Sequence, residues 1–222
     1  MTRALEAQRR EPLSGETRSC VVFLHGYGAN AADLIGLADP LGEHMPDTLF
    51  ISPDAPEECP GVPMGRQWFP IPWIDGSSEE ESKIGLDRAA ADLDAFLDGV
   101  MVDEDLLPEQ VMVLGFSQGT MMALHVVPRR EDVIAGIVGF SGRLMEPELL
   151  ADETLSRPPV LLIHGDADDV VPPQSLPQAA EALQGAGWQE IYAHIMKGTG
   201  HGIAPDGLSV ALAFMRDRLG LS

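Results

Sequence analysis

The sequence has few basic residues, no long apolar run and no repeats, and each shortage narrows what the protein can do. Its 222 residues include 14 Lys and Arg against 35 Asp and Glu, a formal net charge of −21. A surface this acidic repels phosphate backbones and anionic bilayers, so we expect no nucleic-acid partner. No segment approaches the ~18 apolar residues of a membrane span, so we expect no stable membrane insertion. Arg9 and Arg10 are not followed by the apolar stretch of a secretion signal, and we therefore expect a cytoplasmic protein.

Cysteine is also scarce, because Cys20 and Cys59 are the only two. Two cysteines without metal-like spacing exclude a disulfide framework and a zinc site of the usual kind. Cys20 opens an apolar run and is predicted to be buried. Cys59 lies between Glu58 and Pro60 and is predicted to be exposed or half-buried, and the two thiols are not expected to pair.

Short apolar runs alternate with longer segments of helical periodicity. The runs 21–24 and 160–163 show no polar alternation, which is typical of parallel strands covered on both faces. The pattern predicts an α/β fold with a mostly parallel central sheet and helices on both faces. Strands are expected at 20–25, 48–52, 111–115, 133–140, 160–163 and 191–196. Helices are expected at 84–100, 118–127, 176–184 and 208–219, the last with Asp206 as its N-cap.

The length fits one domain. We expect residues 19–222 to form it and residues 1–18 to be an N-terminal arm or edge strand of the same domain. Residues 142–159 offer only a short acidic helix, which is too little for a large cap domain. Residues 53–75 hold six prolines and three aromatic residues, Trp68, Phe69 and Trp73. A loop this long inside a compact domain is usually functional.

The pentapeptide Gly115-Phe116-Ser117-Gln118-Gly119 follows an apolar strand and precedes a helical stretch. Glycines at its ends allow a tight strand-to-helix turn that lifts the serine hydroxyl above the sheet. The helix N-terminus behind it offers unpaired N–H groups to a developing oxyanion. The pattern therefore predicts Ser117 as a nucleophile.

A serine nucleophile needs a base, and six histidines compete for that role. Only His201, in Gly200-His201-Gly202, lies on a late, glycine-flanked loop after the last strand. The acid is expected just after strand 160–163, where spacing alone leaves Asp166, Asp168 and Asp169 open. Asp206 is a weaker candidate because a helix cap explains it.

Four segments occur together in order: Leu24-His25-Gly26-Tyr27-Gly28, the pentapeptide at 115–119, His164-Gly165-Asp166-Ala167-Asp168 and Gly200-His201-Gly202. From about Cys20 onward the chain resembles the phospholipase/carboxylesterase family, known also for acyl-protein thioesterases, within the α/β-hydrolase superfamily. Asp169 departs from this pattern, since relatives often have proline there.

The resemblance implies that Asp168 is the acid of a Ser117–Asp168–His201 triad, with the backbone amides of Tyr27 and Gln118 as the oxyanion hole. It implies a serine carboxylesterase acting on small-molecule esters, thioesters or lysophospholipids through an acyl-enzyme. No metal or organic cofactor is expected, and relatives are often monomers or homodimers.

Trp68 and Phe69 are candidates to line the acyl groove, although packing of the long loop explains them equally well. Two rival functions remain. Residues 26–31 match G-x-G-x-x-A with Asp54 further on, as in a dinucleotide-binding fold, but this leaves the triad residues unexplained. A non-catalytic receptor with this fold would usually lack a triad member.

Overall fold

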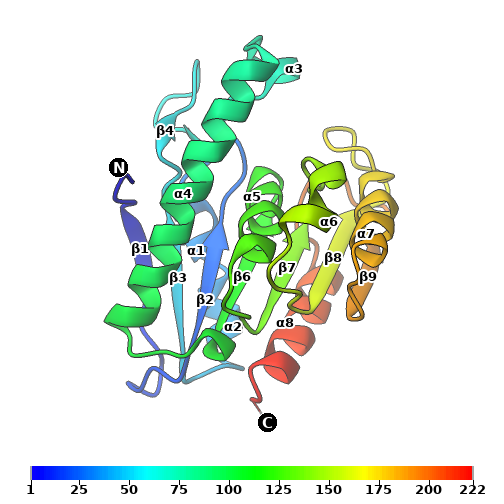
Figure 1. Ribbon diagram of the computed structural model, residues 1–222. Helices are drawn as coiled ribbons and strands as arrows, with labels where there is room; N and C mark the ends of the chain where they lie inside the picture. Colours follow the sequence, from blue (N-terminus) through cyan, green and yellow to red (C-terminus); the bar gives the residue numbers. More distant parts are fainter. Residues whose placement is uncertain (1, 222) are drawn as a thin grey trace.

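The computed structural model describes residues 2–221 and contains a seven-stranded sheet with helices on both faces (Figure 1). Six strands are parallel, and β1 pairs antiparallel with β3 at one edge. This confirms the predicted α/β-hydrolase class. The strands of the sheet are β1 Ala7–Arg10, β2 Ser19–Leu24, β3 Thr48–Pro53, β6 Val111–Phe116, β7 Gly136–Phe140, β8 Val160–Gly165 and β9 Ile191–Met196.

The strand order β1-β3-β2-β6-β7-β8-β9 determines where a ligand can bind. From β2 the chain passes outward to β3 and then returns to the other side of β2 as β6. At such a reversal the loops after two adjacent strands diverge and leave a crevice at their carboxyl ends. The carboxyl ends of β2 and β6 are therefore the expected site, and Ser117 follows β6 directly.

Two apolar layers hold the helices to the sheet. Alternate strand residues face opposite sides, so Val22 belongs to the core beneath α4, α5 and α7, whereas Val21 and Phe23 belong to the core beneath α1, α2 and α8. The helices are α1 Ala31–Ile35, α2 Ala38–Gly42, α3 Pro72–Asp75, α4 Glu79–Asp103, α5 Gln118–Val126, α6 Leu150–Glu153, α7 Ser175–Gly185 and α8 Pro205–Arg218. Between β7 and β8 the only α-helix is the four-residue α6, so there is no large cap.

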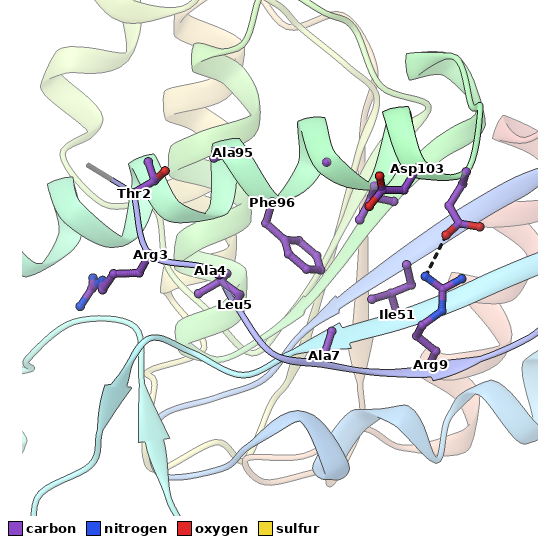
Figure 2. A pocket seen from close by; sticks show the side chains of 13 residues that line it. Thr2, Arg3, Ala4, Leu5, Ala7, Arg9, Ile51, Ala95, Phe96 and Asp103 are labelled. Atoms are coloured by element: carbon purple, nitrogen blue, oxygen red, sulfur yellow. Dashed lines mark ion pairs between the residues drawn. The ribbon is translucent and has the colours of Figure 1, made fainter.

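The N-terminal arm runs alongside α4 before it enters the sheet as β1. Figure 2 shows Leu5 and Phe96 on facing sides of the depression between the arm and the helix. Arg9 Nη1 pairs with Glu104 Oε1 at 2.8 Å. Arg3 reaches further along α4, where its backbone N and its Nε donate to the buried Asp92 at 2.6 and 2.7 Å.

Three local predictions are corrected by the structure. Helix α4 begins at Glu79, before the predicted residue 84, because the side chain of Ser78 and that of Glu81 form a reciprocal cap. Asp206 is not an N-cap: Ala204 holds that position, and the Asp206 carboxylate pairs with His194 at 2.9 Å.

Cys59 is buried rather than exposed, at 4 % accessibility. It lies in a hairpin formed by β4 Glu57–Glu58 and β5 Arg66–Gln67, which turns its side chain inward. Cys20 is buried as predicted, and neither thiol is in a disulfide. Within residues 2–221, the structure contains no helix with the length and apolar character needed to span a membrane.

Candidate active site

Ser117 lies on a sharp turn between β6 and α5, with φ 54° and ψ −114°. A positive φ is costly for a residue with a Cβ, and such strain is characteristic of functional sites. Gly119 makes the turn possible, because a Cβ there would lie 1.9 Å from the Leu24 carbonyl oxygen. Helix α5 therefore starts directly against the end of β2.

Neighbouring backbone fixes the turn in place. Ser117 N donates to Phe140 O at 2.9 Å, and Thr120 Oγ1 lies 2.8 Å from both Phe140 O and Gly115 O. These contacts tie the turn to the end of β7. The strain at Ser117 is thus offset by hydrogen bonds from two adjacent strands.

His201 Nδ1 lies 2.8 Å from Asp168 Oδ2, and the carboxylate is fully buried. The other carboxylate oxygen accepts from Val170 N and Val171 N, each at 2.9 Å. Burial alone would raise the pKa of Asp168, but the hydrogen bonds from His201 and the two amides hold the pKa below its ordinary value. Asp168 is therefore an anion that fixes the orientation of the His201 ring.

A second histidine, His164, also touches this carboxylate. His164 Nε2 lies 2.9 Å from Val171 O and 3.3 Å from Asp168 Oδ2. The contact to a carbonyl requires a proton on Nε2, so this ring also donates toward Asp168. No role is predicted for His164 from the sequence; it lies within β8, directly after the apolar run 160–163.

Phe116, the residue before Ser117, contacts the ring of His201. Its ring centroid lies 4.9 Å from that of His201. Within residues 2–221 the Ser117 hydroxyl makes no hydrogen bond to His201, and such contacts are commonly long before substrate binds.

The segment after β2 passes beside Ser117, since a Cβ added at Gly26 would lie 3.3 Å from Ser117 Cβ. In the described part of the chain, Tyr27 N–H donates no hydrogen bond, and Gln118 N–H belongs to the first turn of α5, where helix amides lack intrahelical acceptors. Two amide donors are thus free at the edge where an oxyanion would form.

His25 orients the first of these amides. Its Nε2 accepts from Ala55 N at 3.0 Å, so the proton is on Nδ1, which donates to Gly26 O at 2.8 Å. Burial lowers the pKa of His25 and keeps the ring neutral. Because Gly26 O and Tyr27 N–H belong to one planar peptide, holding the carbonyl also aims the N–H.

Trp68 and Phe69 lie in the core, with exposed fractions of 0 % and 1 %. Trp68 Nε1 donates to His25 O at 3.0 Å, and the Gln118 side chain binds Trp68 N and Phe69 O at 2.9 and 2.7 Å. This burial favours the packing role that the sequence left open beside groove lining. The exposed aromatic residue of the segment is Trp73, at 56 %.

The other candidate carboxylates are engaged elsewhere. Asp166 Oδ1 accepts from Gly198 N at 2.6 Å, which stabilises the loop that carries His201. Asp54 Oδ1 accepts from Ala31 N at 2.7 Å, so its position after β3 is explained without a dinucleotide. Among residues 2–221 no group of three metal-ligating side chains is assembled. The cavity of about 420 Å³ beneath the N-terminal arm contains none of the site residues (Figure 2).

Comparison with known proteins finds relatives that cover nearly the whole chain. The chain is 30% identical to acyl-protein thioesterase 1 of Saccharomyces cerevisiae over 91% of its length and 93% of that protein. It is 27% identical to acyl-protein thioesterase 1 of Gibberella zeae, with 94% of both chains covered. The crystal structure of esterase PE8 superposes with a TM-score of 0.91 at 41% identity, covering 97% of this chain and 100% of that one. Residues 11–219 match the family described as Phospholipase/Carboxylesterase, and the chain belongs to that family.

Proposed function

We propose that the protein is a serine carboxylesterase that cleaves esters through an acyl-enzyme on Ser117. The observation that carries the proposal is the 2.8 Å contact between His201 Nδ1 and the buried Asp168 carboxylate, beside a serine in a strained turn. This is the arrangement in which an imidazole acts as general base for a hydroxyl. The relatives named esterase or thioesterase support the same reaction class.

In the proposed reaction, His201 Nε2 accepts the Ser117 proton as Oγ attacks the substrate carbonyl carbon. Asp168 holds the ring in the tautomer that leaves Nε2 free and stabilises the imidazolium. His201 then gives the proton to the departing alcohol or thiol. Water repeats the sequence on the acyl-enzyme, so the net reaction is hydrolysis with no cofactor.

The oxyanion is proposed to bind the Tyr27 and Gln118 amides. Each such donor contributes roughly 3–4 kcal/mol to transition-state stabilisation in comparable sites. Two contacts support this role. The neutral His25 holds the Gly26 carbonyl of the peptide that carries the Tyr27 N–H, and the Gln118 side chain is anchored to Trp68 N and Phe69 O.

The test is Ser117→Ala, assayed on p-nitrophenyl butyrate. We expect kcat to fall by a factor of about 10⁶, the scale for losing a triad nucleophile. Ser209→Ala is the matched control, since Ser209 lies on the exposed face of α8 and donates only to Pro205 O. Undiminished turnover by Ser117→Ala would refute the mechanism.

Thioester cleavage is the second candidate, and the names of the two thioesterase relatives favour it. Because both reactions use one set of groups, a panel of p-nitrophenyl esters and acyl thioesters with matched acyl chains distinguishes them. A cytoplasmic location and a monomeric or homodimeric state remain proposals, to be checked by cell fractionation and light scattering.

A further inference from the structure

Helix α3 is tied to the segments on both sides of the nucleophile. On one side, Tyr27 Oη donates to Asp75 Oδ2 at 3.3 Å, and Tyr27 follows the glycine that packs against Ser117. On the other side, the guanidinium carbon of Arg143 lies 4.9 Å from the centre of the Trp73 ring. Arg143 follows Gly142, where a Cβ would lie 2.9 Å from Ser117 O. In the sequence, Trp73 is therefore two residues from Asp75, the partner of Tyr27, and Arg143 is one residue from Gly142, which packs against Ser117.

The guanidinium of Arg143 is held in place but has no anionic partner. Within residues 2–221 it forms no ion pair and no hydrogen bond. Stacking on an indole fixes the plane of a guanidinium while its N–H edges remain free to bind a ligand.

The neighbouring carboxylates are already occupied. Asp75, two residues after Trp73, accepts from Ile71 N at 2.8 Å and Ser77 N at 2.9 Å in addition to Tyr27. Glu146, three residues after Arg143, pairs with Lys83 at 2.7 Å. Neither of these two carboxylates pairs with Arg143 in the described part of the chain.

A groove of about 790 Å³ leads away from this position, between the segment after β7 and the start of α7. Arg143, Leu144 and Pro147 form one side, and Pro172 and Ser175 are on the other. Pro172 directly follows Val171, whose amide holds Asp168. The only charged residues that line the groove are Arg143 and Glu181, and the two do not pair in the described part of the chain.

We propose that Arg143, stacked on Trp73, binds an anionic oxygen group of the substrate, a carboxylate or a phosphate, near the scissile ester. The inference rests on the proposed esterase function and adds a substrate class to it. The acidic surface opposes the approach of such substrates at long range, but that field is screened beyond about 8–10 Å in physiological salt. A direct contact to a guanidinium acts inside that distance and is frequently bidentate.

The test compares matched substrates that differ in one anionic group. For a carboxylate on the acyl part, the pair is mono-p-nitrophenyl glutarate and p-nitrophenyl valerate. For a phosphate on the alcohol part, the pair is butyryl glycerol phosphate and monobutyryl glycerol. The measured quantity is the ratio of kcat/KM for the anionic substrate to that for the neutral one.

We expect Arg143→Gln to lower this ratio about tenfold or more in at least one pair, through a higher KM for the anionic substrate. Arg143→Lys should retain part of the ratio, and Trp73→Ala should lower it. Arg157→Gln is the matched control, because Arg157 also stacks on an indole, that of Trp188 at 5.6 Å. It precedes the amino end of β8, however, whereas Arg143 follows the carboxyl end of the parallel strand β7. This control should keep the wild-type ratio.

An Arg143→Gln ratio equal to wild type in both pairs would overturn the anion site. A wild-type protein that hydrolyses none of the four esters would instead contradict the proposed function, so the two failures are distinguishable.

Discussion

Replacing Gly119 by alanine tests whether the close approach of α5 to β2 positions Ser117, the proposed nucleophile. The added Cβ would lie 1.9 Å from Leu24 O, 2.4 Å from Leu24 C and 2.9 Å from His25 O. All three are backbone atoms, so no side chain can rotate away. To reach even 3.0 Å, below which such contacts are essentially never seen, the start of α5 must retreat by about 1 Å.

That retreat carries Ser117 and the Gln118 amide with it. A misplacement of about 1 Å costs on the order of 10²-fold in rate, and overpacking of this kind costs about 1–3 kcal/mol in stability. We therefore expect Gly119→Ala to lose about 10²-fold in kcat on p-nitrophenyl butyrate, normalised to the folded fraction measured by circular dichroism, and to have a lower Tm.

Gly99→Ala is the matched control. Gly99 lies inside α4, and a Cβ there would meet nothing within 4 Å. It should keep full activity and gain about 0.5–1 kcal/mol, the usual benefit of removing a mid-helix glycine. Wild-type kcat and Tm in Gly119→Ala would refute the reasoning.

Three other predictions concern the groups that hold the site and the arm. Asp168→Asn should lower kcat by about 10⁴-fold, because an amide favours the wrong tautomer of His201; steady-state kinetics at neutral pH measures this, and a loss below tenfold would contradict it. The folded pKa of Asp168 is depressed, so its contribution to stability is present above its unfolded pKa of about 3.9 and is lost as the pH falls through the lower folded value. The Tm difference between wild type and Asp168→Asn should therefore shrink below about pH 4, and a difference that grows there would be inconsistent. Arg3→Ala removes one partner of the buried Asp92 carboxylate and should lower the free energy of unfolding by about 1–3 kcal/mol. In a double-mutant cycle, adding Asp92→Asn should recover part of that loss.

Much of the fold could be predicted from the sequence because parallel strands buried on both faces leave uninterrupted apolar runs. The runs at 21–24 and 160–163 lie within β2 and β8. The start of α4 was missed although Ser78 and Glu81 form a recognisable capping box, since the prediction followed the apolar stripe alone.

Contacts between distant segments were harder to anticipate. Asp206 fits an N-cap locally, but β9 brings His194 next to it, and its carboxylate hydrogen-bonds to that ring at 2.9 Å. Cys59 lies in a polar stretch, yet the hairpin turns its thiol inward, where a Cβ on Gly28 would lie 3.9 Å from Sγ. The Trp73–Arg143 stack joins residues that are separated in the sequence by two helices, α4 and α5, and two strands, β6 and β7, and no local pattern indicates it.

In the site itself, sequence spacing does not distinguish Asp166, Asp168 and Asp169 as the acid that orients His201, and only the resemblance to the family favours Asp168. The distances now distinguish the first two, because Asp168 contacts His201 and Asp166 contacts Gly198 N. The spacing of residues in a loop does not show which of their side chains points toward the histidine.

The central claim, that the Ser117 hydroxyl is activated by His201, is tested most directly by covalent labelling. The protein is treated with a fluorophosphonate, digested and analysed by mass spectrometry, in parallel with His201→Ala. We predict a single adduct on Ser117 that forms rapidly in wild type and at least 10²-fold more slowly in the variant. An adduct on another residue, or equal labelling rates in both proteins, would contradict the account.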